Sequence, residues 1–247
     1  MTVHFIGAGP GAADLLTLRA VALLGSCPVC LYAGSLVPPE VLGHCAPGTR
    51  FVDTAGLTLE DIVAEFVAAD RAGHDVARLC SGDPSIFSAL AEQIRRLDSA
   101  GLDYDITPGV PAFAAAAASL RRELTVPGLG QTVVLTRTSV QATPMPAREQ
   151  LAELGALRAT LVLHLSVRRV GSVLAELEPF YGPDCPVAIV ANASRADEII
   201  VRGTLADITP KVHAAAIERT AVIIVGAVLG AEDFCDSHLY SSQRERS

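Results

Sequence analysis

The sequence predicts an α/β protein built from two domains. Apolar strand-like runs alternate with segments of helical periodicity through most of the 247 residues. This alternation is interrupted at residues 121–131, where charges, a proline and two glycines replace the periodic pattern. We therefore expect an N-terminal α/β domain over residues 1–120, a linker over residues 121–131 and a C-terminal α/β domain over residues 132–247.

The first half begins with a strand over residues 3–6, a glycine-rich loop over residues 7–12 and a helix capped by Asp14. The apolar residues expected on the buried side of that helix are Leu15, Leu16, Leu18, Val21 and Leu24. Thr58 and Asp61 have the spacing of a capping box, which predicts the start of another helix. The remaining elements expected in this half are strands over 29–33, 76–80 and 104–107 and helices over 84–97 and 112–120.

The second half alternates in the same way. Its expected strands cover residues 132–136, 160–165, 186–191, 198–202 and 221–228, and its expected helices cover residues 148–154, 167–180 and 205–217. We expect residues 198–202 to pair with residues 186–191 as a hairpin. This half therefore belongs to the same structural class as the first.

Asp83 stands at the end of the apolar run over residues 76–80, where a helical pattern follows. Gly82 allows a sharp turn, and Pro84 suits the first turn of a helix. Open α/β sheets bind ligands at the carboxyl ends of their strands, so we expect a ligand beside Asp83. The alternative is a tight turn in which Asp83 only caps a helix. The similar loop over residues 7–12 favours a ligand held against two strand ends.

Composition excludes several classes of partner. A net charge of −8 argues against nucleic acid. The longest apolar stretches, residues 112–120 and 220–230, are much shorter than the ~20 residues of a membrane span. The first residues have no basic region or cleavage site of a signal peptide, so we expect a cytoplasmic protein. Because charged residues make up only 19% of the chain, we also expect a homo-oligomer with a buried interface.

A zinc site is one alternative to consider, because Cys27, Cys30 and Cys45 lie close together in the sequence and His44 precedes the last of them. Cys30, however, falls inside a strand-like run and would face the core, and the chain has no second CxxC pair. We therefore expect no metal and interpret the cysteines as small buried residues.

A nicotinamide oxidoreductase is a second alternative, because Gly7, Gly9 and Ala12 satisfy the loose dinucleotide-binding pattern. Pro10 removes a backbone N–H from the stretch that would hold the pyrophosphate. The second strand also ends without an acidic residue for the ribose. The loop is therefore better suited to close packing against an uncharged or cationic group.

With these segments in view, the sequence resembles the tetrapyrrole methyltransferases, S-adenosylmethionine-dependent enzymes that build corrins and siroheme. The matching segments, in the order of the family, are residues 7–11 with 15–17, then 81–84, 108–112 and 191–194. Residues 32–38 and 135–139 look most like the members that methylate precorrin-4 at ring carbon 11 in cobalamin biosynthesis. The resemblance implies that activity, with a sibling acting on another ring carbon or on cobalt-precorrin-4 as the alternative.

The resemblance also implies a fold of two α/β domains with a cofactor cleft between them, and a homodimer. The cofactor would be S-adenosyl-L-methionine, released as S-adenosyl-L-homocysteine. The residues implied to contact it are Pro10, Ser81, Gly82, Asp83, Ile86, Pro111, Ala112, Leu165, Ala193 and Ala221. Many relatives have Tyr-Met-Gly where this chain has His164-Leu165-Ser166, which changes the side-chain part of that contact.

The acceptor implied is a small-molecule tetrapyrrole with several carboxylate arms, for which arginine is a suitable partner. Arg137 follows a predicted strand inside a matching segment and is the first candidate, with Arg121, Arg122, Arg168 and Arg195 as weaker ones. Tyr32 and Ser35, at the end of the second strand, would reach the reacting ring. We assign no catalytic base, since methyl transfer from a sulfonium depends mainly on alignment of donor and acceptor.

Overall fold

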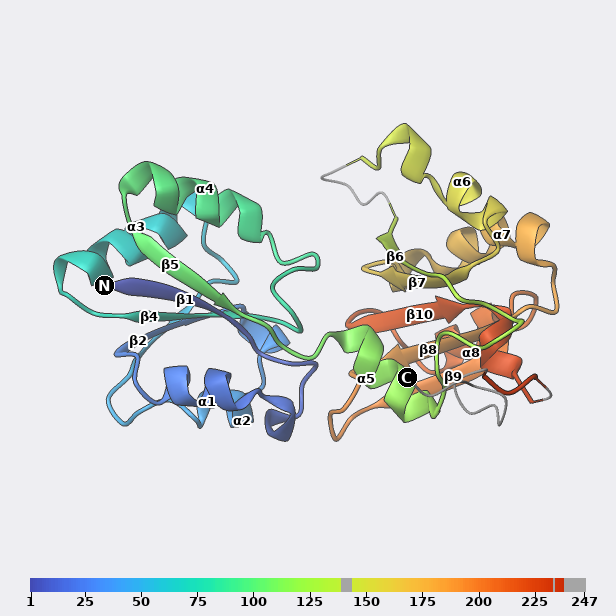
Figure 1. Ribbon diagram of the computed structural model, residues 1–247, viewed down its shortest axis with the longest axis horizontal. Coiled ribbons are helices and arrows are strands. Elements are labelled where there is room, and N and C mark those ends of the chain that lie inside the picture. Colours follow the sequence, from blue (N-terminus) through green and yellow to red (C-terminus); the bar gives the residue numbers. More distant parts are fainter. Residues whose placement is uncertain (139–143, 233, 238–247) are drawn as a thin grey trace, which may run out of the picture. The chain divides into compact units, whose positions relative to one another are not determined.

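The structure is a computed structural model that describes residues 1–138, 144–232 and 234–237 (Figure 1). The chain forms two compact units, Met1–Ala115 and Ala116–Ser247, each with its own sheet. Residues 121–131, whose role as a linker stays a prediction, pack on the second unit, where Thr160 Oγ1 donates to the carbonyl of Leu124 at 3.1 Å. In the described ranges no helix has the length and apolar character needed to span a membrane.

The first unit contains a five-stranded sheet in the order β3-β2-β4-β1-β5, and every neighbouring pair is parallel. Its strands are β1 (Thr2–Gly7), β2 (Val29–Tyr32), β3 (Arg50–Asp53), β4 (Val76–Cys80) and β5 (Asp103–Thr107). Its helices are α1 (Leu18–Leu24), α2 (Pro39–Leu42), α3 (Leu59–Arg71) and α4 (Leu90–Ala100), with the 3-10 helices η1 (Ala13–Leu15) and η2 (Gly34–Leu36) and the start of α5 (Ala112–Leu120).

Helices cover both faces of this sheet, with α1 and α2 on one side and α3 and α4 on the other (Figure 1). Alternate residues of the strands supply the two cores, as the pleat requires. Phe5 packs with Phe66 and Leu97 on the α3–α4 side, and Ile6 packs with Leu24 on the opposite side. The rings of Phe5 and Phe66 meet edge to face with centroids 6.3 Å apart.

Strands β1 and β4 are neighbours, but the chain leaves them in opposite directions. After β1 it proceeds to β2, on one side, and after β4 it proceeds to β5, on the other side. Their carboxyl ends therefore form a topological switch point, where connecting loops diverge and open α/β sheets bind their ligands.

The second unit contains a mixed five-stranded sheet in the order β6-β7-β10-β8-β9. Only β6 and β7 are parallel to each other, and the other three pairs are antiparallel. The strands are β6 (Val133–Arg137), β7 (Thr160–His164), β8 (Pro186–Ala191), β9 (Ile199–Thr204) and β10 (Ala221–Val225). The helices are α6 (Leu151–Ala156), α7 (Val170–Tyr181) and α8 (Ile208–Ala214), with the 3-10 helices η3 (Ala147–Glu149), η4 (Val167–Arg169) and η5 (Ala227–Gly230).

The core of the second unit lies between one face of its sheet and the helices α6, α7 and α8. Leu163, Ile189 and Ile223 come from three strands and are fully buried together with Leu174 of α7 and Ile208 of α8. The predicted hairpin of β8 and β9 is confirmed, with Val190 opposite Ile200.

Two predictions for the first half are wrong in detail. Asp14 lies in η1 and does not cap α1, because the Thr17 hydroxyl oxygen accepts the backbone N–H of Ala20 at 3.1 Å instead. Leu18 is consequently the first residue of α1 and is 90% exposed, not buried. The helix expected from residue 84 begins only at Leu90, because Phe87 and Ala89 have left-handed backbones with φ of 53° and 52°.

Strand β3 was not predicted, because it is short and carries a charged residue at each end. The capping box of α3 is confirmed, since Thr58 accepts from the backbone of Asp61 and the Asp61 carboxylate accepts from the backbone of Thr58. In the second half, the three predicted helices begin later than expected, two of them after a 3-10 turn.

Candidate functional site

Three glycines meet at the carboxyl edge of the first sheet. A Cβ atom on Gly109 would lie 2.3 Å from the carbonyl oxygen of Gly82 and 2.8 Å from Cα of Gly7. A Cβ atom on Gly7 would lie 2.4 Å from the nitrogen of Gly109. The ends of β1 and β5 can approach this closely only because Gly7 and Gly109 have no side chain, whereas Gly82 contributes its carbonyl oxygen and a left-handed backbone with φ of 67°. We call Gly7, Gly82 and Gly109 the glycine junction.

The loops after β1 and β4 are hydrogen-bonded to each other beyond the junction. The nitrogen of Gly9 donates to the carbonyl of Gly82 at 3.2 Å, and the nitrogen of Gly82 donates to the carbonyl of Gly9 at 2.8 Å. Both glycines are left-handed, with φ of 72° and 67°. Pro10 follows Gly9 directly and is buried. The structure therefore brings the two loops that were singled out from the sequence into direct contact.

The Asp83 carboxylate holds the neighbouring loops in place. Oδ1 accepts the backbone N–H of Ser85 at 2.8 Å and also the Ser85 hydroxyl. Oδ2 accepts the backbone N–H of Gly109 at 2.8 Å. Burial raises the pKa of Asp83, but these hydrogen bonds from Ser85 and Gly109 outweigh it and leave the pKa lowered. Asp83 is thus a carboxylate that remains ionised in the site.

The other residues predicted from the first half lie on the same loops. Pro111 and Ala112 are adjacent to Gly82, since a Cβ on Gly82 would lie 3.6 Å from each. Ile86 is half-buried and donates its backbone N–H to the carbonyl of Asp83 at 3.3 Å, whereas Ser81 is exposed. All of the predicted cofactor residues of this half therefore gather at the switch point.

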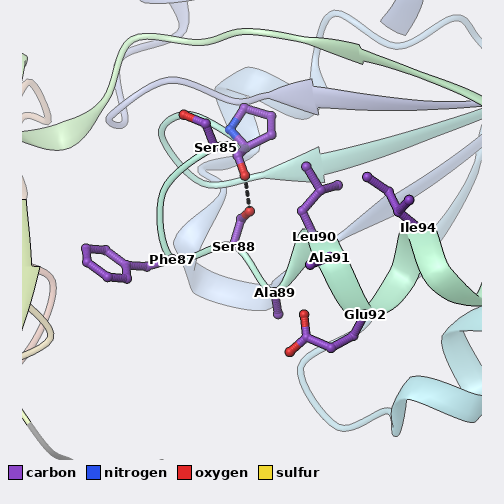
Figure 2. A pocket seen from close by; sticks show the side chains of 9 residues that line it. Ser85, Phe87, Ser88, Ala89, Leu90, Ala91, Glu92 and Ile94 are labelled. Carbon is purple, nitrogen blue, oxygen red and sulfur yellow. Dashed lines mark hydrogen bonds between the residues drawn. The ribbon is translucent and has the colours of Figure 1, made fainter. Parts of the chain in front are cut away.

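The loop between β4 and α4 borders a pocket of about 340 Å³. The residues that line it are Pro84, Ser85, Phe87, Ser88, Ala89, Leu90, Ala91, Glu92 and Ile94. Figure 2 shows the Ser88 hydroxyl donating to the carbonyl of Pro84, and the Phe87 ring pointing away from Leu90 and Ile94. Left-handed backbones at two non-glycine residues of one loop indicate strain of the kind found near binding sites.

Tyr32 lies at the carboxyl end of β2, half-buried, with its ring 6.4 Å from that of Phe51 in an edge-to-face contact. The loop behind it turns at Gly34, whose nitrogen donates to Oδ1 of Asp53 at 2.9 Å. Ser35 falls in η2, and its side chain lies outside the part of the chain that the structure describes. Tyr32 is therefore supported from the apolar core and from β3.

The second unit has several residues with left-handed backbone at one end of its sheet. Leu165 after β7, Asn192 after β8 and Thr220 before β10 are left-handed, with φ of 55°, 50° and 52°. Because β10 runs antiparallel to β7 and β8, its first residue lies level with their last ones, and Ala221 is opposite Ala191. The predicted residues Leu165, Ala193 and Ala221 thus share one end of the sheet.

Arg137 belongs to the same end, because it is the last residue of β6 and pairs with His164 of β7. Its Nη1 donates to the carbonyl of Thr138 at 3.3 Å. The Ser166 hydroxyl supports this corner by donating to the carbonyl of His164 at 2.7 Å and accepting the backbone N–H of Thr138 at 3.1 Å. Burial lowers the pKa of His164, so its imidazole is neutral at pH 7. The segment that contains Arg137 continues to Ser139, which lies outside the described residues.

The first-unit edge fits a cofactor held by shape and backbone groups. The glycine junction removes side-chain bulk, and Pro10, Pro111 and Ala112 add small apolar surface. Asp83 adds one ionised carboxylate near which a cation is favoured. The sequence did not predict that Gly7 and Gly109 approach each other closely, although residues 108–111 indicated a turn at Gly109.

The comparisons with known proteins agree with this geometry. A family model described as Tetrapyrrole (Corrin/Porphyrin) Methylases matches residues 2–209. The chain belongs to this family. A precorrin-4 C(11)-methyltransferase of Rhodococcus erythropolis is 61% identical over 247 residues, which are 100% of this chain and 99% of that protein. The predicted tetrapyrrole methylase fold, the family and the methyltransferase activity are thereby confirmed.

Two solved tetrapyrrole methylases resemble this chain closely. The X-ray structure of a cobalt precorrin-4 methyltransferase, a cobalamin biosynthetic enzyme, matches with a TM-score of 0.89 at 38% identity and covers 92% of this chain and 95% of its own. A uroporphyrin-III C-methyltransferase of Thermus thermophilus, complexed with S-adenyl homocysteine, matches with a TM-score of 0.77 at 30% identity and covers 93% of this chain and 99% of its own.

Membership of the tetrapyrrole methylases leaves the nicotinamide oxidoreductase without support. Over the described ranges, His, Cys, Asp and Glu side chains form no group of three or more that could hold a metal ion. Cys30 is fully buried in the α1–α2 core, as predicted from its place in a strand, and Cys27 is buried there as well.

Proposed function

We propose that this protein transfers a methyl group from S-adenosylmethionine to ring carbon 11 of precorrin-4, giving precorrin-5 in cobalamin biosynthesis. The observation that carries the proposal is the glycine junction with its ionised Asp83, in a chain 61% identical over its full length to a precorrin-4 C(11)-methyltransferase. The solved cobalt precorrin-4 methyltransferase is less similar, at 38% identity, which favours a metal-free substrate.

The bound sulfonium cofactor supplies an activated methyl group, and the chain's own residues have to hold and align its surroundings. Pro10, Gly82 and Pro111 would pack against the cofactor with small surfaces and backbone groups. Asp83 would stabilise the positive charge and keep the loops around Gly109 and Ser85 in place. Alignment of this kind is worth ~7–11 kcal/mol in favourable cases, so a catalytic base is not required to explain the rate.

The second unit offers small residues and left-handed backbone at one end of its sheet. Ala193 and Ala221 are buried, and Leu165 is 64% exposed although it is apolar and left-handed. The left-handed backbone and the exposed apolar side chain of Leu165 both cost free energy, and a ligand that covers the side chain would offset this cost. We assign Leu165, Ala193 and Ala221 to the cofactor, and Ser81, Ile86 and Ala112 to the edges of its site.

Tetrapyrrole binding is assigned to residues at three strand ends. Arg137 would bind a carboxylate arm of the macrocycle through its guanidinium, which presents a fork of donors. Tyr32, whose ring contacts that of Phe51, would contact the macrocycle, and Ser35 is assigned to the same ligand. These residues orient the acceptor carbon toward the methyl donor and exclude water from it.

We also propose a cytoplasmic homodimer. The chain has few charged residues, and it exposes apolar side chains such as Leu18, at 90%, and Phe51, at 47%. Burial of such a surface in a second copy would stabilise the assembly by about 25 cal/mol per Å² of apolar area. Light scattering coupled to size-exclusion chromatography tests this, and a monomer at micromolar concentration would contradict it.

The activity is tested with purified protein, a precorrin-4 supply from upstream enzymes and S-adenosylmethionine labelled with ¹³C in the methyl group. The expected product carries the label on carbon 11 by NMR. Label on another ring carbon would indicate a sibling methylase, and label only with the cobalt-containing precursor would indicate the anaerobic substrate. Calorimetry should detect binding of S-adenosylhomocysteine and none of NAD.

A further inference from the structure

A buried arginine lies in the middle of the first sheet. Arg78 is the third residue of β4 and is 7% exposed, on the face covered by α3 and α4. Among the residues that the structure describes, no carboxylate forms an ion pair with it. Burying a guanidinium without a counter-charge costs free energy, so its hydrogen bonds have to offset that cost.

One branch of these hydrogen bonds leads to the Tyr32 loop. Arg78 Nη1 donates to the Thr54 hydroxyl at 3.1 Å, and that hydroxyl donates to the carbonyl of Tyr32 at 3.0 Å. The backbone N–H of Thr54 donates to the same carbonyl at 2.8 Å. The preceding residue, Asp53, accepts the N–H of Gly34 at 2.9 Å. The position of Arg78 therefore bears on residues 32–36, where tetrapyrrole binding is assigned.

The other branch leads to the loop that borders the pocket. Arg78 Nε donates to Oε1 of Gln93 at 3.0 Å, and Nε2 of Gln93 donates to the carbonyl of Ala89 at 3.0 Å. Gln93 is 3% exposed, so these bonds are shielded from water. Ala89 is the left-handed residue that ends the loop over residues 84–89. This loop continues directly from Asp83, where cofactor binding is assigned.

The two branches fit only an arginine. The Thr54 hydroxyl donates its one proton to the carbonyl of Tyr32 and therefore accepts from Arg78. The Gln93 side chain accepts from Arg78 through its oxygen and donates its amide N–H to the carbonyl of Ala89. A guanidinium provides donors in two fixed directions from one rigid plane. A lysine ammonium is a compact point charge and does not reproduce that fork.

We propose that Arg78 is a positioning residue that couples the Tyr32 loop to the loop over residues 84–89, so that cofactor binding at one loop orders the other for the tetrapyrrole. The inference rests on the proposed function, which assigns one ligand to each loop. Coupling between two binding sites is reciprocal, so the tetrapyrrole also strengthens cofactor binding through the same bonds. Thr54 and Gln93 transmit the effect on either side of Arg78.

The test follows hydrogen–deuterium exchange of Leu36 and Val37, whose backbone N–H groups close η2 on the carbonyls of Ala33 and Gly34. S-adenosylhomocysteine should slow their exchange by roughly fivefold in the unchanged protein. Thr54→Val keeps the shape but loses the hydroxyl, and should abolish this slowing. Thr54→Ser restores the hydroxyl and is the matched control, in which the slowing should return.

The second branch is tested by Gln93→Glu, which still accepts from Arg78 Nε but no longer donates to Ala89. It too should abolish the slowing at Leu36 and Val37. A role in folding alone would change the thermal midpoint and leave the ligand-dependent slowing intact, which is the outcome that overturns the inference. No slowing in the unchanged protein also overturns it.

Kinetics give an independent readout. Thr54→Val should raise KM for the tetrapyrrole by roughly tenfold while kcat changes less than about twofold. If S-adenosylhomocysteine does not bind at all, the proposed function is wrong, and the inference that rests on it is wrong as well. If it binds but the exchange of Leu36 and Val37 is the same in Thr54→Val and Thr54→Ser, only the coupling is wrong.

Discussion

The backbone N–H of Gly109 donates a 2.8 Å hydrogen bond to Oδ2 of Asp83 and so ties the carboxyl end of β5 to that of β4. The same carboxylate holds Ser85 through its other oxygen. Asp83 therefore stabilises the turn but caps no helix, because α4 begins only at Leu90, and the ligand expected beside Asp83 stays a prediction. Its charge contributes to the stability of the edge as well as to the site.

Asp83→Asn should lower the free energy of unfolding by about 1–3 kcal/mol at pH 7, because an amide cannot accept all of the hydrogen bonds from Ser85 and Gly109. The folded-state pKa of Asp83 is lowered, so its contribution is present above the unfolded pKa of about 4 and is lost as the pH falls through the folded value. Urea unfolding of both proteins at about five pH values between pH 3 and pH 7 measures how this stability difference depends on pH. A constant difference at all pH values would contradict it.

Gly109→Ala should destabilise the first unit by about 3 kcal/mol or more, because the new methyl group would lie 2.3 Å from the carbonyl oxygen of Gly82. Gly56→Ala is the matched control in the same unit, since nothing lies within 4 Å of its added Cβ and its stability should change by less than about 1 kcal/mol. Urea midpoints compare the two. Equal midpoints would show that the strand ends are farther apart than the structure places them.

Arg137→Ala should raise KM for the tetrapyrrole by roughly 10-fold to 100-fold, the equivalent of one lost charge-assisted hydrogen bond. KM for S-adenosylmethionine should stay within about twofold, because the cofactor is assigned to other residues. Arg148→Ala, an exposed arginine in η3, is the control for nonspecific loss of charge. An equal rise in both variants would remove Arg137 from the acceptor site.

The thiols should differ sharply in reactivity toward iodoacetamide at pH 8. Burial raises the pKa of Cys27 and of Cys185 to about 11, which leaves a thiolate fraction of about one in a thousand. Cys235 is exposed and should be alkylated before Cys27 and Cys185. Mass spectrometry of tryptic peptides over time follows each site. Rapid alkylation of Cys27 in the folded protein would contradict its buried position in the α1–α2 core.

Much of the architecture follows from local patterns in the sequence. The apolar run of β4 with Gly82 behind it predicted a strand end and a turn, and both are present. The capping box at Thr58 was equally local, because both of its partners lie within one helical turn. The prediction that Asp14 caps α1 was wrong because Asp and Thr are both good N-caps. The position of η1 before α1 leaves Thr17 as the N-cap.

The less predictable part of the site depends on contacts between distant segments. The close approach of Gly7 and Gly109 requires β1 and β5 to be neighbours, which no local pattern states. The left-handed backbone of Leu165 has no sequence signal either, because leucine rarely adopts that conformation. The hydrogen bonds of Arg78 likewise join β4 to α4 and to the residue after β3, so the apolar run of β4 does not predict them.

The close approach of the carboxyl ends of β1, β4 and β5 also has a consequence for engineering. A substitution changes a side chain, so it offers few ways to alter a contact that a ligand makes with backbone atoms. At a tightly packed edge, the same substitution can block folding. Libraries that seek a new acceptor should therefore leave Gly7, Gly82 and Gly109 untouched and randomise positions 32–36 and 137. Under the proposed function, such libraries would change the acceptor selectivity and leave the assigned cofactor site unchanged.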